Sequence, residues 1–227
     1  MPWALEPESK DSMSYLQDIL CDVPGLMEDA MNLQNSELEA LEMAAHYQAL
    51  SKNVLNHCHQ LYVWRARWEE ENPNSCHNIP AQEHPNKQSL FRTKLYFSSV
   101  NQTDQILLYN ITLIFLTELS IQVACPIFDF STPAIYWPPI SDCRPLCLPS
   151  DAETTHTIAI EICECIGFYF SDYRRFCLLA ALRAAYTAFS RTSEQVKWLN
   201  TILEKVADLS GLDISKVLYA EEQIDIR

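Results

Sequence analysis

The chain contains only three glycines, Gly25, Gly167 and Gly211, among 227 residues. An average protein contains about 7% glycine. Because the three are isolated, the chain has no glycine-rich phosphate loop and no dinucleotide-binding fingerprint. The scarcity also argues against an all-β fold, which needs many glycine-containing turns. The hydrophobic share of 48% is enough to build a sizeable core, so we expect a folded chain with few tight turns.

Apolar residues recur at spacings of three and four along most of the chain, which is the period of an α-helix. Pro24-Gly25 interrupts the first stretch, so we expect a break there. Residues 91–100 fit either an extended segment or the entry to the next helix. The pattern predicts helices at about 12–21, 26–33, 36–70, 104–124, 150–170, 173–189, 192–210 and 213–222. Capping boxes are expected at Ser36 with Glu39, Ser150 with Glu153, and Thr192 with Gln195.

Two proline-containing segments separate these helices. The first spans about 72–90 and contains three prolines, and the second spans 126–149 and contains six. Proline lacks the backbone N–H that helices and central strands require, so both segments are expected to be loops. The prediction is an all-α fold, an irregular multi-helix bundle or array, in a single helical domain over 1–227.

The charge is strongly acidic and uneven. The chain has 16 basic and 30 acidic residues, a net charge of −14, and residues 1–90 carry −9 of it, from 5 basic and 14 acidic groups. Binding to nucleic acid needs a basic face, so we expect no direct contact with DNA. The apolar stretch from Ile106 to Phe128 contains Glu118 and Gln122, which are costly in a bilayer. We therefore expect a buried helix there and no membrane partner.

The N-terminal residues have no basic region followed by an apolar run, so we expect neither a secretory signal nor a transit peptide. The nine cysteines are an odd number, which cannot close into a complete disulfide set. Both observations favour the cytosol or the nucleus. Cys58, Cys125, Cys163 and Cys177 lie in apolar or helical surroundings and are expected to be small buried thiols.

Three groups of residues have the chemistry of metal ligands. The densest is His57-Cys58-His59 with Cys76-His77, but consecutive helix residues point in different directions. The second combines Cys143 and Cys147 with Cys163 and Cys165, whose spacings are not those of zinc sites. The third, Glu153-Thr154-Thr155-His156, has the spacing of a helical di-iron motif, which requires a second copy that the chain lacks. We predict no metal and no cofactor.

No catalytic motif was found, since the chain has neither a nucleophile elbow nor a zincin helix. We assign no catalytic residue and expect no enzyme. Its aromatic residues fit either an ordinary core or the lining of a small-molecule pocket. They are Trp64, Trp68, Phe128, Phe130, Tyr136, Trp137, Phe168, Tyr169 and Phe170.

Several short segments carry a resemblance to a known family. Arg175-Phe176-Cys177-Leu178-Leu179-Ala180-Ala181-Leu182-Arg183-Ala184-Ala185-Tyr186 is similar to the Leu-Leu-x-Pro-Leu-Arg-x-Ala-Tyr helix of the regulatory domain of fungal transcription factors, which follows their zinc binuclear cluster. Similar segments of that domain match Asp18-Ile19-Leu20, Pro24 to Glu28, Leu107-Leu108-Tyr109-Asn110 and the Trp198-Leu199, Ile202-Leu203 pattern. They keep one order over about residues 15–220. Ala181 stands where the family often has proline.

The resemblance implies a nuclear regulator of fungal type that lacks the DNA-reading head, because the chain has no Cys-x-x-Cys pair. It implies protein partners, among them a full-length transcription factor, and allows a small-molecule effector. One alternative is a small helical enzyme or ligand-binding protein of secondary metabolism. The other is a truncated transcription factor whose missing upstream part encodes the zinc cluster.

Overall fold

The fold is all-α. The computed structural model describes residues 10–80, 90–91, 93–123, 152–169 and 176–210. Helices make up 81% of these residues, and the only strands among them pair in a small hairpin, which confirms the predicted class. In chain order the elements are α1 (Ser12–Gln34), α2 (Ala40–Glu71), β1 (Cys76–Pro80), β2 (Thr93–Phe97), α3 (Val100–Val123), α4 (Ala152–Tyr169), α5 (Phe176–Ala188) and α6 (Glu194–Ser210).

Helix α1 is continuous, and the predicted break at Pro24-Gly25 was wrong. The helix begins after Asp11, whose carboxylate accepts a hydrogen bond from the backbone N–H of Ser14 at 2.6 Å. Its buried residues continue through the proline at helical spacing. They are Leu16, Ile19, Val23, Leu26 and Ala30. Burial of this stripe outweighs the local preference of proline and glycine to end a helix.

Helix α2 begins four residues later than predicted, at Ala40. Glu39 is its N-cap residue but makes no side-chain capping bond, so the capping box expected from Ser36 does not form. The Ser36 hydroxyl instead donates to the carbonyl of Leu33 at 2.8 Å, near the end of α1. Glu39, rather than Ser36, occupies the N-cap position of α2.

The segment that the sequence predicted as a loop at about 72–90 contains β1, the first strand of a β-hairpin. β1 and β2 are antiparallel, with Cys76 opposite Phe97 and Ile79 opposite Lys94. Leu95 and Phe97 are buried while Lys94 and Tyr96 are exposed, which is the alternation of a half-buried strand. The structure corrects the loop assignment for Cys76–Pro80 and assigns 93–97 to the extended alternative.

The predicted core helix appears as α3. Its length and composition would allow it to cross a membrane, yet 72% of its most apolar 18-residue segment is buried within the protein. Buried positions occur on every side of the helix, and they include Asn110, Thr112 and Thr117. The Thr117 hydroxyl donates to the carbonyl of Leu113 at 2.7 Å, which satisfies it inside the helix.

The C-terminal helices agree with the predicted ones to within a few residues. α6 begins after Ser193, whose hydroxyl accepts a hydrogen bond from the backbone N–H of Val196 at 3.2 Å. The cap is therefore one residue later than the predicted Thr192. On α6, Trp198 contacts Phe91 edge to face, with ring centroids 5.0 Å apart. The predicted loop at 126–149, the capping box at Ser150 and the helix at 213–222 lie outside the described residues.

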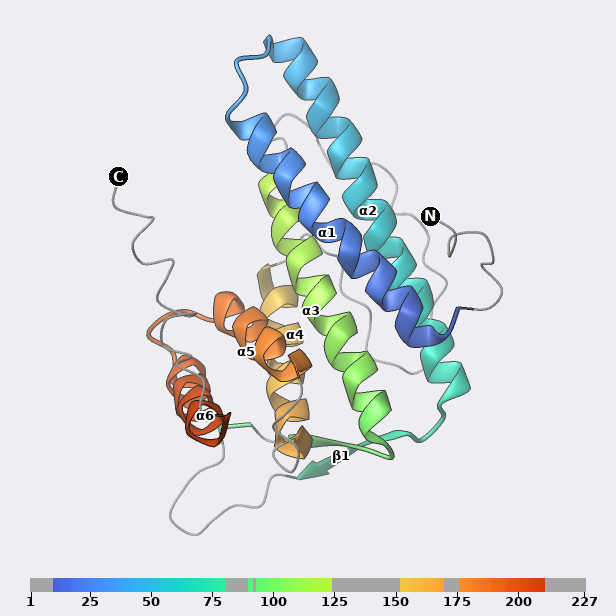
Figure 1. The fold of residues 1–227 in the computed structure, drawn as a ribbon, viewed down its shortest axis with the longest axis vertical. Coiled ribbons are helices and arrows are strands. Elements are labelled where there is room, and N and C mark those ends of the chain that lie inside the picture. The colour runs from blue at the N-terminus through green and yellow to red at the C-terminus, as the bar shows by residue number, and fades with distance from the viewer. Residues whose placement is uncertain (1–9, 81–89, 92, 124–151, 170–175, 211–227) are drawn as a thin grey trace. The chain divides into compact units, whose positions relative to one another are not determined.

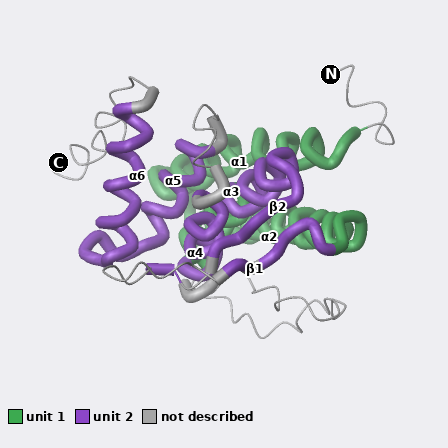
Figure 2. The backbone as a smooth tube through the Cα atoms, turned by 90° about the horizontal axis from the view of Figure 1, so that it is seen from below, with its two compact units in different colours: residues 1–73, 112–155 green, residues 74–111, 156–227 purple. Residues whose placement is uncertain are grey.

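The chain divides into two compact units (Figure 2). One comprises residues 1–73 and 112–155, and the other comprises residues 74–111 and 156–227. The boundaries fall within α3 and α4 and at the end of α2. The single domain expected over 1–227 stays a prediction.

Candidate protein-binding surface

Helices α1 and α2 form an antiparallel hairpin within the first unit (Figure 1). Close to the start of α1, the indole Nε1 of Trp64 donates to the Ser12 hydroxyl at 2.8 Å and to the Ser12 carbonyl at 3.1 Å. Trp64 also stacks on Trp68, with ring centroids 6.3 Å apart, and both rings are buried. These contacts anchor α1 to the C-terminal half of α2.

The opposite end of the hairpin, around the turn between α1 and α2, is exposed to solvent. None of residues 31–49 is buried, whereas Ala30 and Leu50 on either side of this stretch are. Four apolar side chains in this stretch or one helical turn before it are exposed, with exposed fractions of 44% for Met27, 61% for Met31, 37% for Leu38 and 83% for Leu41. Met27 and Met31 lie one helical turn apart and share a face of α1. We call residues 27–42 the hairpin end.

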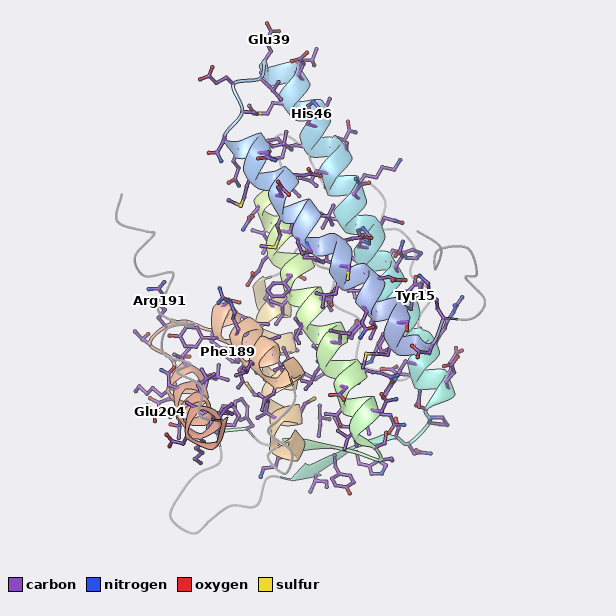
Figure 3. All side chains as sticks on the ribbon, in the orientation of Figure 1. Tyr15, Glu39, His46, Phe189, Arg191 and Glu204 are labelled. Carbon is purple, nitrogen blue, oxygen red and sulfur yellow. The ribbon has the colours of Figure 1, made fainter. Side chains whose placement is uncertain are left out.

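The hairpin end is also acidic. Between Lys10 and Lys52 the chain has eight acidic residues and no lysine or arginine. All eight are exposed. Five of them, Glu28, Asp29, Glu37, Glu39 and Glu42, belong to the hairpin end, where Glu39 points away from both helices (Figure 3). None of the five forms an ion pair with a residue that the structure describes.

Exposed apolar groups in an acidic surface are a chemical feature of protein-binding sites. Contiguous apolar exposure marks interaction surfaces, and surrounding charge selects the partner and speeds its approach. Methionine is flexible and polarisable, so Met27 and Met31 can adapt to different partner shapes. The hairpin end is therefore the candidate functional surface in the described part of the chain.

The first group of possible metal ligands, His57-Cys58-His59 with Cys76-His77, is not gathered in one place. Cys58 is buried, His59 is exposed, and His57 Nε2 lies 3.9 Å from the Asp22 carboxylate on α1. On β1, Cys76 is half-buried and its neighbour His77 is exposed. In the described segments, no three His, Cys, Asp or Glu side chains gather as they would around a metal ion.

The second group of possible metal ligands, Cys143 and Cys147 with Cys163 and Cys165, lies only partly within the described chain. Cys163 and Cys165 on α4 are buried free thiols, as is Cys58 on α2. Burial, together with the negative charge of the neighbouring Glu164, raises the pKa of Cys163. A thiol that stays protonated is a poor metal ligand. Burial of Cys58 and Cys163 confirms two of the four predicted core thiols, while the side chains of Cys125, Cys177, Cys143 and Cys147 are outside the described set.

The remaining candidates have structural contacts where they are described. His156 of the Glu153-x-x-His156 motif packs edge-on against Phe189, with ring centroids 5.2 Å apart, while the side chain of Glu153 lies outside the description. Of the aromatic residues considered for a pocket, Trp64 and Trp68 are core residues. The other seven have no described side chain.

The sequence predicted that the acidic face at residues 1–71 would suit a protein partner, but it did not locate the hairpin end within that face. It assigned Leu38 and Leu41 to the apolar stripe of a helix starting at residue 36, although both are exposed in the structure. The available signal was the run without lysine or arginine between Lys10 and Lys52.

Comparisons with known protein families, curated proteins and solved structures find no match to this chain.

Proposed function

We propose that this chain is a nuclear, transcription-regulator-like protein of fungal type that binds other proteins and catalyses no reaction. The observation that carries the proposal is the hairpin end, where Met31 and Leu41 are 61% and 83% exposed within an acidic surface. Such side chains cost solubility, and they gain free energy only when a partner covers them. The regulatory context comes from the resemblance of the helical segments to fungal transcription-factor domains.

The proposed mechanism does not include direct contact with DNA. The chain carries a net charge of −14, and the eight acidic residues between Lys10 and Lys52 would repel phosphates. Regulation would then require a partner that reads DNA, such as a full-length transcription factor. The chain would supply a protein-binding surface to that partner.

A tethering experiment tests this function. The chain is fused to a heterologous DNA-binding domain in a fungal cell, and transcription of a reporter beneath the matching site is measured. We expect the fusion to change reporter output, and the double variant Met31→Ser/Leu41→Ser to return it to the level of the DNA-binding domain alone. The substitutions remove apolar surface but keep the charge of the hairpin end.

The matched control is Leu55→Ser/Val63→Ser, which removes two apolar side chains from α2 that are 39% and 37% exposed outside the hairpin end. This control should preserve the reporter effect, with circular dichroism verifying that both variants fold. A fusion that leaves transcription unchanged would refute the regulatory role. Equal loss in both variants would refute the assignment to the hairpin end.

A further inference from the structure

The hairpin end combines two properties that together restrict the chemistry of its partner. Its exposed apolar side chains, Met27, Met31, Leu38 and Leu41, are interspersed with five exposed carboxylates. No described residue neutralises those carboxylates through an ion pair. A partner must therefore supply both apolar contact and positive charge.

We propose that the occupant of the hairpin end is a lysine- or arginine-rich amphipathic segment of another protein. The inference rests on the proposed function in that it names the partner of the same surface. Apolar residues of the segment would cover Met27, Met31, Leu38 and Leu41. Its basic residues would lie against the carboxylates, including Glu39 and Glu42.

Charge complementarity selects this occupant over other binding partners. Nucleic acids and anionic membranes carry negative charge, and an acidic peptide would be repelled in the same way. A second copy of the chain would place a net charge of −14 against an equal one. Charge alone mainly raises the association rate and specificity, so the apolar residues are required for retention of the segment.

The apolar residues of the hairpin end come from both sides of the turn between the two helices. Met27 and Met31 share a face of α1, whereas Leu38 precedes α2 and Leu41 lies in its first turn. An amphipathic helix, which carries its own apolar anchors at intervals of three and four residues, is a common form of segment that binds exposed apolar side chains. The flexible side chains of the two methionines would let the surface accept more than one such helix.

The inference is tested by titrating the full chain with a labelled 18-residue leucine–lysine amphipathic peptide. Leucine–glutamine and leucine–glutamate versions of the peptide, with the same leucine spacing, test the charge requirement. We expect saturable binding of the lysine version alone. Binding of the neutral or acidic version with equal affinity would overturn the proposal.

Variants locate the binding site on the chain. We expect Met31→Ser/Leu41→Ser to weaken binding by about tenfold or more, and Glu39→Gln/Glu42→Gln to weaken it and reduce its salt dependence. The matched controls are Leu55→Ser/Val63→Ser for the apolar contacts and Glu204→Gln/Asp208→Asn on α6 for the charges. An equal effect of controls and hairpin-end variants would show that the peptide binds through general acidity, which contradicts the proposal.

Comparison with the tethering experiment separates the two proposals. If the peptide requires the hairpin end while reporter transcription does not respond, the basic segment stands as partner and the regulatory role fails. If the reporter requires the hairpin end while no basic peptide binds, the regulatory role stands and the partner chemistry is wrong.

Discussion

The cysteines of this chain differ in exposure, and this difference predicts which thiols are reactive. Cys21 lies exposed on α1, whereas Cys58, Cys163 and Cys165 are buried. Burial raises the pKa of Cys58 to about 12, so at pH 8 this thiol is protonated as well as inaccessible. Since the thiolate is the nucleophile, exposure and pKa act in the same direction.

We therefore predict selective alkylation. Brief iodoacetamide treatment at pH 8, followed by peptide mass spectrometry, should modify Cys21 and leave Cys58, Cys163 and Cys165 intact. In denaturant all four should react, which serves as the control. Modification of Cys163 as fast as Cys21 in the native protein would contradict its burial in α4.

The N-cap of α1 gives a prediction about acid stability. The hydrogen bond from the Ser14 backbone N–H lowers the pKa of Asp11 below its usual value of 3.8. A lowered pKa means that Asp11 stabilises the fold above pH 3.8, and that this contribution is lost as the pH falls through the folded-state value. Asparagine caps a helix without titrating.

The Asp11→Asn variant should consequently lose less stability than the natural protein between pH 6 and pH 3, measured by thermal melts. Asp11→Ala, which lacks the cap at every pH, should melt lower than both at pH 6. An identical acid loss in the natural protein and in Asp11→Asn would show that the Asp11 cap does not operate in solution.

Among the elements, α1 contains the clearest conflict between local preference and tertiary packing. Pro24 lies exposed inside the helix and lacks the N–H that would bond to the carbonyl four residues earlier. Gly25 follows it, and a Cβ built at that position would have nothing within 4 Å. Neither residue contributes packing that a substitution to alanine would remove.

Both alanine substitutions should stabilise the protein. We expect Pro24→Ala to raise the free energy of unfolding by about 2–3 kcal/mol and Gly25→Ala by about 1 kcal/mol, measured by urea unfolding. Val23→Ala, which removes buried volume one residue away, should instead lower it by about 1–2 kcal/mol. A loss of stability in Pro24→Ala would mean that the proline ring has a packing role.

The same helix shows how far the sequence predicts the fold. Helical periodicity located all six described helices, because buried apolar stripes leave a repeating pattern. The prediction failed at Pro24, where the burial of Val23 and Leu26 outweighs the tendency of proline and glycine to end a helix. It also missed β1, since a short hairpin strand depends on its partner strand rather than on its own pattern.

The candidate surface was harder to predict because it depends on which apolar residues remain uncovered. Leu41 and Leu50 fit the same sequence pattern, yet Leu41 is 83% exposed and Leu50 is 4% exposed. The difference arises from tertiary packing, which periodicity does not contain. The negative charge of this region is evident from the sequence. Together with the exposure of the apolar side chains in the structure, it identifies the hairpin end.

At the scale of the whole molecule, the segments on which the predicted resemblance to fungal regulators rests belong largely to the core. Leu107, Leu182 and Leu199 are completely buried, and Ile202 and Leu203 are nearly so. Core residues determine packing, whereas function depends on surface residues. This is why the proposed function rests on the hairpin end, with the resemblance supplying only its context.

The net charge of −14 leads to a prediction for DNA binding. Electrophoretic mobility shifts with the purified chain and a pool of duplexes should show no sequence-specific complex at physiological salt, because a chain with this net negative charge is repelled by phosphates. A sequence-specific, salt-resistant shift would contradict the proposal that the chain acts through a DNA-reading partner.

The central claim is that the hairpin end binds the partner, and hydrogen exchange with the leucine–lysine peptide tests it most directly. Amides at the turn and helix ends exchange readily, so an occupied hairpin end should protect them. We predict slower exchange over residues 27–42 with the peptide bound, and unchanged exchange in β1, β2 and α6. Protection confined to those other elements, or no protection at residues 27–42 under saturating peptide, would contradict the claim.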